Sequence, residues 1–426
     1  MGIKLRLVVM NFLQYAIWGA YLTSMGSYLV GVGLVSHIGI FYAMQGIVSL
    51  FMPAVIGIVA DRWVPAQRLL GICHLLAALF MGAAGYYAFS SGAEVSFGVL
   101  FTLYSLSVAF YMPTIALSNS VAYCVLEGAG LDTVKSFPPI RVWGTVGFIC
   151  SMLVCDAAGF QTTCMQFVQC AVLGLALGLY AMTLPGCPVS RAGNKKSLVE
   201  ALGLRAFTLF RQRRMALFFV FSMLLGVSLQ ITNGFANPFI TSFRDIPQYA
   251  STFGANHANA LISLSQVSET LCILLIPFFL KRFGIKNVML MAMFAWVLRF
   301  GLFGLGNPGS GVWMFVLSMI VYGVAFDFFN ISGSLFVNKE TDVAIRSSAQ
   351  GLFMIMTNGV GATIGTLGAQ AVVNRCVYSQ STPEAMVGGW SESWLIFAGY
   401  ALVVTLVFAL VFRYRHDPAA LAGESR

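Results

Sequence analysis

Residues 57–68 read GIVADRWVPAQR, a short charged stretch between two long apolar segments. A related stretch, PFFLKRFGIK, occupies residues 277–286 at the corresponding place in the second half of the chain. Both follow the second apolar segment of their half and carry basic residues at the turn. Because duplicated halves of this kind are typical of secondary transporters, the repeat predicts two similar bundles of apolar helices.

Composition supports a membrane protein. Of the 426 residues, 58% are hydrophobic and 9% are charged, whereas about a quarter are charged in soluble domains. Apolar runs of about 20 residues, each able to cross a hydrocarbon core of roughly 30 Å, recur along the chain. We therefore expect an all-α protein in the lipid bilayer, with twelve transmembrane helices at residues 5–31, 36–60, 67–90, 95–125, 139–159, 162–184, 213–241, 254–282, 286–306, 310–337, 347–374 and 391–414.

The longest connection divides these helices equally. It predicts a six-helix bundle at 1–185, a basic linker at 186–213 and a second six-helix bundle with a short tail at 214–426. Of the 24 Lys and Arg residues, only Arg244, Arg299 and Arg375 fall outside the loops and helix ends of one side. The positive-inside rule makes that side cytoplasmic and places both termini there. The net charge of +9 is thus explained by topology, and a nucleic acid partner is not expected.

The stretch at 57–68 closely resembles the G-x-x-x-D-R signature of the major facilitator superfamily. Its gating residues here are Gly57, Asp61, Arg62 and Arg68. Asp61 ends a helix, where the macrodipole disfavours an anion, so we expect it to pair with a basic neighbour or with the start of the helix near Ser347. The chain contains neither a nucleotide-binding P-loop nor a hydrolase motif, so we expect neither ATP coupling nor enzymatic activity.

Polar side chains within the predicted spans are the candidates for a binding site. Such groups are costly in a bilayer and normally face a cavity or a partner. Those that share helix faces in five spans include Gln14, Trp18, Arg141, Thr145, Phe148, Gln230, Asn233, Gln266, Glu269, Tyr322, Phe326 and Asp327. This mix of side chains suits a nucleoside as cargo. Aromatic faces can stack on its planar base, and amides and carboxylates can hydrogen-bond its ribose hydroxyls and base edges. A monosaccharide would use similar groups, so a sugar or glycoside remains the alternative cargo.

Two carboxyl groups suggest the energy source. Glu269 and Asp327 lie near the middle of their spans, where an unpaired charge is expensive. Arg299, also within a span, would lower that cost by an ion pair with either acid. A carboxyl poised in this way can load a proton on one side and release it on the other. We take Glu269, Asp327 and Arg299 as candidates for proton coupling.

Four segments, FPPIRVWGTVGF (137–148), LQITN (229–233), SQVSET (265–270) and IVYGVAFDFFNISGS (320–334), resemble bacterial nucleoside permeases of the nucleoside–proton symporter family. The resemblance implies proton-driven import of purine and pyrimidine nucleosides by alternating access across the bacterial inner membrane. We also expect a monomer, as is general for carriers of this architecture, with neither a cofactor nor a metal. The resemblance also implies that the family's binding cavity is formed here by Arg141, Thr145, Phe148, Gln230, Asn233, Gln266, Glu269, Tyr322, Phe326 and Asp327.

Overall fold

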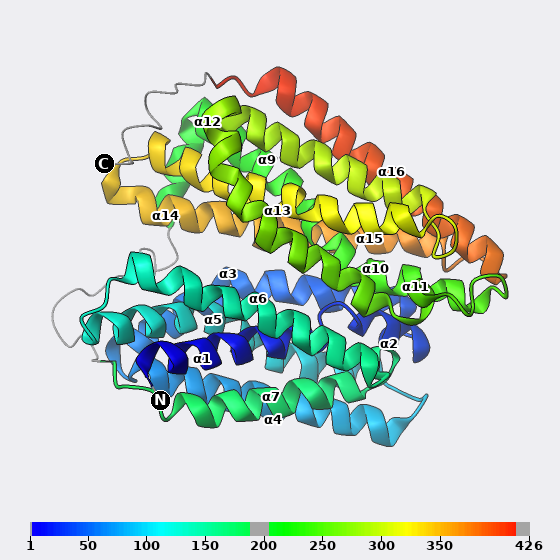
Figure 1. Ribbon diagram of the computed structural model, residues 1–426, viewed down its shortest axis with the longest axis horizontal. Helices are drawn as coiled ribbons and strands as arrows, with labels where there is room; N and C mark the ends of the chain where they lie inside the picture. Colours follow the sequence, from blue (N-terminus) through cyan, green and yellow to red (C-terminus); the bar gives the residue numbers. More distant parts are fainter. Residues whose placement is uncertain (1, 188–203, 415–426) are drawn as a thin grey trace. The chain divides into compact units, whose positions relative to one another are not determined.

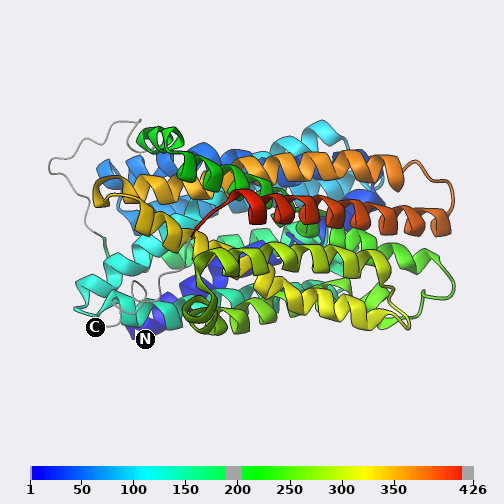
Figure 2. The same ribbon diagram turned by 90° about the horizontal axis from the view of Figure 1, so that it is seen from above.

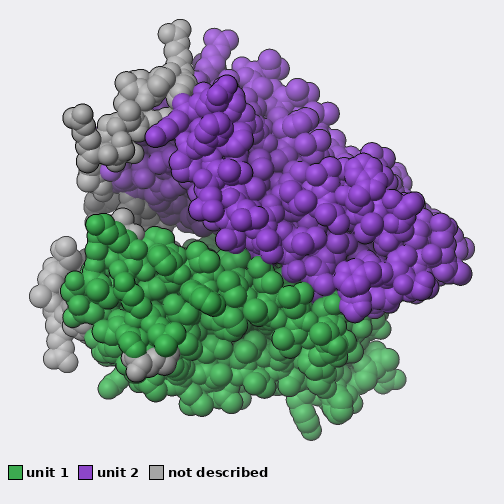
Figure 3. All heavy atoms as spheres, in the orientation of Figure 1, with its two compact units in different colours: residues 1–202 green, residues 203–426 purple. Residues whose placement is uncertain are grey.

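The computed structural model describes residues 2–187 and 204–414, which form helices and connecting loops without a β-strand. The all-α prediction is therefore confirmed for this part of the chain. The residues form two compact units, 1–202 and 203–426, which Figure 3 shows in different colours. Most of the predicted linker lies outside the described residues, and its final part forms a 3₁₀-helix, Leu204–Arg211.

The first unit is a bundle of long helices that lie alongside one another in both ribbon views (Figures 1 and 2). Helix α1 packs against α6 and α7, while α4 lies between α5 and α7. Its helices are α1 (Ile3–Gly19), α2 (Met25–Gly31), α3 (Ile38–Arg62), α4 (Ala66–Ser91), α5 (Phe97–Gly128), α6 (Thr133–Ala157) and α7 (Met165–Ala181).

The second unit contains α9 (Arg213–Leu229), α10 (Ile231–Ser242), α11 (Phe253–Asn256), α12 (Ala258–Leu305), α13 (Val312–Glu340), α14 (Val343–Met354), α15 (Ala362–Cys376) and α16 (Pro383–Val411). A π-helical segment, Ile355–Gly361, connects α14 to α15. The core of this unit is aromatic: Trp296, Trp390 and Trp394 are among the largest fully buried side chains.

Helix α12 contains a break that the sequence predicts. Its 48 residues include Gly284, whose φ of 76° and ψ of 167° are not helical. A continuous helix of that length would extend about 72 Å, more than twice the hydrocarbon core. The predicted division between residues 282 and 286 is therefore confirmed. Within the described residues, nine helices, α12 counted once, are long and apolar enough to span a membrane, and Met165–Ala181 is a shorter apolar helix.

Two predicted helix starts are wrong. Helix α16 begins at Pro383 rather than 391, because Thr382 accepts a hydrogen bond from the Ala385 N–H and proline suits the first helical turn. Helix α6 begins at Thr133 rather than 139. The pair Pro138 and Pro139 resembles a helix boundary in the sequence, but both residues lie inside the helix.

Glycines allow α1 and α6 to approach closely. A Cβ atom added to Gly147 would collide with the backbone carbonyl of Phe12, and one added to Gly19 would collide with that of Phe148. Small residues at helix interfaces are the usual means of close packing between membrane helices. The same device joins α9 to the π-helix and α15, where Gly226, Gly361 and Gly365 meet backbone atoms of the facing segment.

We expect Gly147→Ala to lower the thermal stability of the protein, because the added methyl group must push α1 away from α6. Overpacking of this kind costs about 1–3 kcal/mol. The matched control is Gly82→Ala, whose added Cβ would make an ordinary 3.5 Å contact with Ala171 Cβ. Thermal unfolding in detergent should show a lower midpoint for Gly147→Ala alone. Equal midpoints for the two variants would contradict the packing argument.

Candidate functional site

In the first unit, α6 presents the predicted residues Arg141, Thr145 and Phe148. Spacings of four and three residues put all three on one face of the helix. The Arg141 guanidinium lies 3.9 Å from the centre of the Tyr15 ring, a cation–π contact with α1. Phe148 is buried and packs edge-on against Trp18, with ring centres 6.3 Å apart. The close α1–α6 approach therefore sets the positions of both Arg141 and Phe148.

Trp18 is half-buried, and its ring nitrogen makes a polar contact with α3. Its Nε1 donates to Gln45 Oε1 at 3.3 Å, and Gln45 Nε2 donates to the Tyr104 hydroxyl at 2.9 Å. The Trp18 ring also lies 6.2 Å from that of Tyr111. These contacts fix the indole beside Phe148. The three rings of Trp18, Tyr111 and Phe148 form one aromatic wall with contributions from α1, α5 and α6.

Gln14 serves as an interhelical hydrogen-bonding group. Its Nε2 donates to Thr114 Oγ1 at 2.8 Å, and its Oε1 lies 2.8 Å from His74 Nε2. Since an amide oxygen only accepts, His74 donates from Nε2. The Tyr111 hydroxyl donates to the backbone carbonyl of Gln14 at 2.7 Å. Gln14, His74 and Thr114 are all fully buried, so this network ties α1 to α4 and α5.

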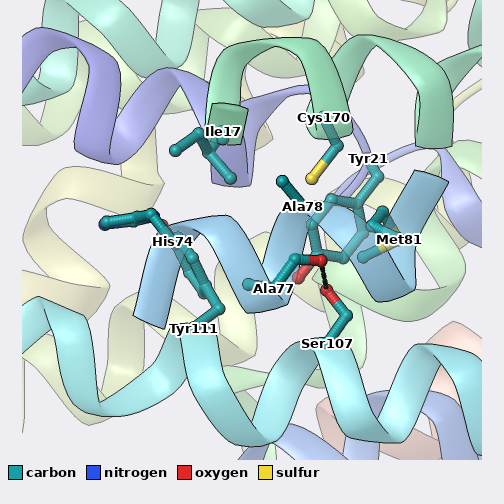
Figure 4. Close-up of a pocket in the computed structure, with 10 residues that line it drawn as sticks. Ile17, Tyr21, His74, Ala77, Ala78, Met81, Ser107, Tyr111 and Cys170 are labelled. Carbon is teal, nitrogen blue, oxygen red and sulfur yellow. Dashed lines mark hydrogen bonds between the residues drawn. The ribbon is translucent and has the colours of Figure 1, made fainter. Parts of the chain in front are cut away.

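Figure 4 shows a small buried pocket beside this network, between α1, α4, α5 and α7. Ser107 donates to the Ala77 carbonyl at one edge of the pocket, at 2.8 Å. The pocket has a volume of about 10 Å³, roughly enough to hold one water molecule. The pocket is therefore far too small for a nucleoside, and none of the predicted site residues whose side chains the structure describes lines it.

In the second unit, Gln230 and Asn233 lie at a break between helices. The prediction of one helix over 213–241 is wrong, because α9 ends at Leu229 and α10 starts at Ile231. Asn233 Nδ2 donates to Gln230 Oε1 at 2.6 Å, and both side chains are half-buried. Helix breaks lining cavities in transporters expose backbone and side-chain polar groups to a solute.

The remaining predicted residues meet where α12 packs against α13. Tyr322 and Phe326 stack with ring centres 5.6 Å apart and an interplanar angle of 16°. Gln266 lies near Tyr322, and Glu269 and Asp327 lie close enough to interact electrostatically. Asp327 is 6% exposed, and its Oδ2 has no hydrogen-bond partner among the described residues.

Gly323 explains how these groups come together. A Cβ atom there would lie 2.6 Å from the Ser268 carbonyl oxygen, so only glycine allows α13 to approach α12 this closely. The Ser268 hydroxyl donates to the Ile320 carbonyl across the same contact. The structure thus brings Gln266, Glu269, Tyr322, Phe326 and Asp327 into one cluster.

Arg299 does not form the predicted ion pair with Asp327 or Glu269. Its Nη1 donates instead to the Ser318 carbonyl at 2.8 Å and lies 3.4 Å from Ser265 Oγ. The guanidinium also lies 4.5 Å from the centre of the Tyr322 ring. Arg299 is 2% exposed and its Nε has no hydrogen-bond partner among the described residues. The prediction assumed that a buried cation needs an acid, whereas a ring face and a carbonyl stabilise it here.

The structure adds residues that the sequence reasoning missed. Tyr15 lies under Arg141, and its spacing of three residues from Trp18 was the available signal. The π-helix at Ile355–Gly361 interrupts the predicted helix 347–374, and such segments often occur at functional sites. Of the gating motif, Gly57 and Arg68 lie on α3 and α4, while the side chains of Asp61, Arg62 and Ser347 are outside the described part.

Comparison with known proteins assigns the family. A model of the family described as "Nucleoside H+ symporter" matches residues 1–417. The chain belongs to the nucleoside–proton symporter family. As a member, it is a multi-pass membrane transporter and not an enzyme, and it couples nucleoside import to protons.

Relatives and solved structures agree with this assignment. The chain is 46% identical to the nucleoside permease NupG of Escherichia coli (strain K12) over 420 residues, 98% of this chain and 97% of NupG. It is 47% identical to the xanthosine permease of the same strain over 421 residues, 98% of each chain. A crystal structure of NupG matches with a TM-score of 0.88 and covers 97% of this chain and 100% of that one. A peptide transporter structure, 14% identical with a TM-score of 0.70, shares the fold.

Proposed function

We propose that the chain imports purine and pyrimidine nucleosides with protons across the bacterial inner membrane, as a monomer that works by alternating access. One observation carries the proposal: a buried carboxyl with an unpartnered oxygen, Asp327, adjoins a stacked aromatic pair, Tyr322 and Phe326. The Asp327 carboxyl can carry a proton, and the aromatic pair offers a face to a nucleobase. The assignment to the family supports the same interpretation.

The proposed topology has twelve crossings with both termini in the cytoplasm. Helix α12 crosses twice, turning at Gly284, which basic residues Lys281, Arg282 and Lys286 flank. By the positive-inside rule, these basic residues favour a turn on the cytoplasmic side of the membrane. Broken pairs such as α9 with α10, and α14 with α15, cross once each. The two six-helix bundles then correspond to residues 1–185 and 214–426.

The nucleoside-binding residues in this proposal are those that the sequence predicts. Tyr322, Phe326 and Phe148 provide apolar and aromatic surface for the base. The amides of Gln230, Asn233 and Gln266 and the guanidinium of Arg141 can hydrogen-bond base edges and ribose hydroxyls. Thr145 adds a hydroxyl. Gln230 and Asn233 already bond one another, so each presents a remaining donor or acceptor to a ligand.

Proton coupling follows from the acids of the cluster. Asp327 and Glu269 interact electrostatically, and two neighbouring carboxylates in a poorly solvated site cannot both remain charged without cost. Binding one proton relieves that cost and leaves the site ready for a neutral nucleoside. The loaded carrier therefore moves one positive charge inward, to which the membrane potential contributes about 2.3 kcal/mol per 100 mV. Arg299 acts on this cluster through Tyr322.

Competition for uptake tests the cargo against a sugar or glycoside. Proteoliposomes containing the purified chain should take up labelled uridine, and unlabelled adenosine should compete. Ribose and the free base each lack half of the ligand, so neither should compete at concentrations where the nucleoside does. Competition by a hexose equal to that by adenosine would overturn the nucleoside assignment and favour the sugar carrier.

A further inference from the structure

A basic groove lies at one end of the second unit, where α9 begins, α12 turns and α16 ends. It has a volume of about 460 Å³ and is lined by Arg214, Lys286, Arg413 and Tyr414. That volume falls within the range of about 300–1,000 Å³ typical of small-molecule sites. None of these residues belongs to the nucleoside cluster or contacts it in the described structure.

Positive charge exceeds negative charge in this groove. Arg214 forms an ion pair with Glu340 at 3.1 Å. Lys286 Nζ donates to a neutral group, the Ala409 carbonyl, at 3.1 Å. Arg413 lies two residues beyond the end of α16 and is exposed. Among the residues that the structure describes, three cations and one carboxylate lie at this groove. It would therefore attract an anion, and the donors would suit phosphate oxygens.

An exposed apolar stripe begins beside the groove. On α16, Leu410 is 76% exposed, Leu406 54% and Val403 60%. Their spacings of four and three residues place them on one face of the helix. Lys286 binds the carbonyl of Ala409, the residue next to Leu410, so the cationic groove and the stripe adjoin. A free phosphate would use only the groove, whereas a phospholipid would use both.

We propose that this groove binds the headgroup of one anionic phospholipid, whose acyl chains lie along the exposed face of α16. Arg413 and Lys286 contact the phosphodiester, and Tyr414 supplies an amphipathic ring at the membrane interface, where tyrosine is enriched. Basic pockets between membrane helices on the cytoplasmic side are suited to such headgroups. The proposal requires a membrane-embedded chain but does not depend on which solute the carrier moves.

The test compares two pairs of substitutions that remove equal charge. Lys286→Gln with Arg413→Gln neutralises the groove and spares the Arg214–Glu340 ion pair. Lys281→Gln with Arg282→Gln is the matched control, because both residues are exposed on α12 near the same turn but do not line the groove. Arg413→Gln alone, beyond the end of α16, is a third variant that cannot disturb helix packing.

Binding of phosphatidylglycerol to the purified full chain would be titrated by native mass spectrometry, with phosphatidylcholine as the neutral comparison. We expect one phosphatidylglycerol to bind the unsubstituted protein more tightly than phosphatidylcholine. The groove pair should lower the affinity for phosphatidylglycerol about 30-fold, and Arg413→Gln should lower it about fivefold. These factors follow from the contribution of each basic residue at an anionic surface. The control pair should change the affinity less than twofold.

Three results would overturn the proposal. Equal losses in both pairs would show that diffuse surface charge, and not the groove, binds the lipid. Equal affinity for phosphatidylcholine would remove the role of the anionic headgroup. Displacement of phosphatidylglycerol by millimolar inorganic phosphate would show that the groove is a site for the free anion instead.

Discussion

Asp327→Asn should abolish accumulation of nucleoside against its gradient while leaving exchange of nucleoside across the membrane intact. The substitution keeps the size and the hydrogen-bonding capacity of the side chain but removes the group that binds a proton. In the proposed mechanism, a potential of 100 mV acting on one co-transported proton supports an accumulation of roughly 50-fold. Without the proton, the ratio of internal to external nucleoside should fall to about one.

Two assays on the same proteoliposomes separate coupling from binding. Uptake driven by an inward proton gradient reports coupling, and counterflow of labelled against unlabelled uridine reports binding and movement. Glu269→Gln is the matched control, since it neutralises the other acid of the cluster. Asp327→Asn should lose uptake driven by the proton gradient and retain counterflow. Accumulation that persists in Asp327→Asn and is lost in Glu269→Gln would transfer the coupling role to Glu269.

Arg299→Gln should weaken nucleoside binding by about tenfold or more, although Arg299 is not itself proposed to contact the nucleoside. Its guanidinium stabilises the Tyr322 ring by a contact of 4.5 Å and ties α12 to the Ser318 carbonyl of α13. A desolvated cation–π contact is worth about 2 kcal/mol, and a charged hydrogen bond about 1.5–3 kcal/mol. Arg299→Lys should recover only part of the affinity, because an ammonium group lacks the planar fork of donors by which the guanidinium lies over the ring and also reaches the Ser318 carbonyl.

A double-mutant cycle distinguishes this positioning role from general destabilisation. Nucleoside affinity would be measured for Arg299→Gln, Tyr322→Leu and the combination. If Arg299 acts through the Tyr322 ring, the second substitution adds little to the first, so the effects are not additive. Additive losses, together with equal losses of thermal stability, would show that Arg299 only supports the fold.

Much of the fold could be predicted because it rests on local properties of the sequence. Runs of apolar residues predict helices in a bilayer, and the glycine at 284 among basic residues predicts the break inside α12. Breaks without such a local signal were missed. The end of α9 at Leu229 and the π-helix at Ile355–Gly361 interrupt apolar sequence, and the close packing of Gly226 on Thr357 connects the two segments.

In the candidate site, too, features with a local sequence signal could be predicted and features that depend on packing could not. Gln266 with Glu269, and Tyr322 with Phe326, share helix faces by spacing, so each pair could be predicted, and Tyr322 and Phe326 do stack. The partner of Arg299 could not, because a buried guanidinium can be stabilised by a ring face and a carbonyl as well as by an acid. Tyr15 under Arg141 depends on how closely α1 approaches α6, which pairs of glycines determine.

Proton movement during nucleoside uptake tests the central claim most directly. Proteoliposomes would be prepared with equal pH on both sides, a trapped pH-sensitive dye and a potassium pathway that prevents build-up of charge. Adding uridine outside should acidify the lumen in step with uridine entry, and Asp327→Asn vesicles should show no acidification. Uridine entry at the normal rate with an unchanged internal pH would contradict proton-coupled transport by this protein.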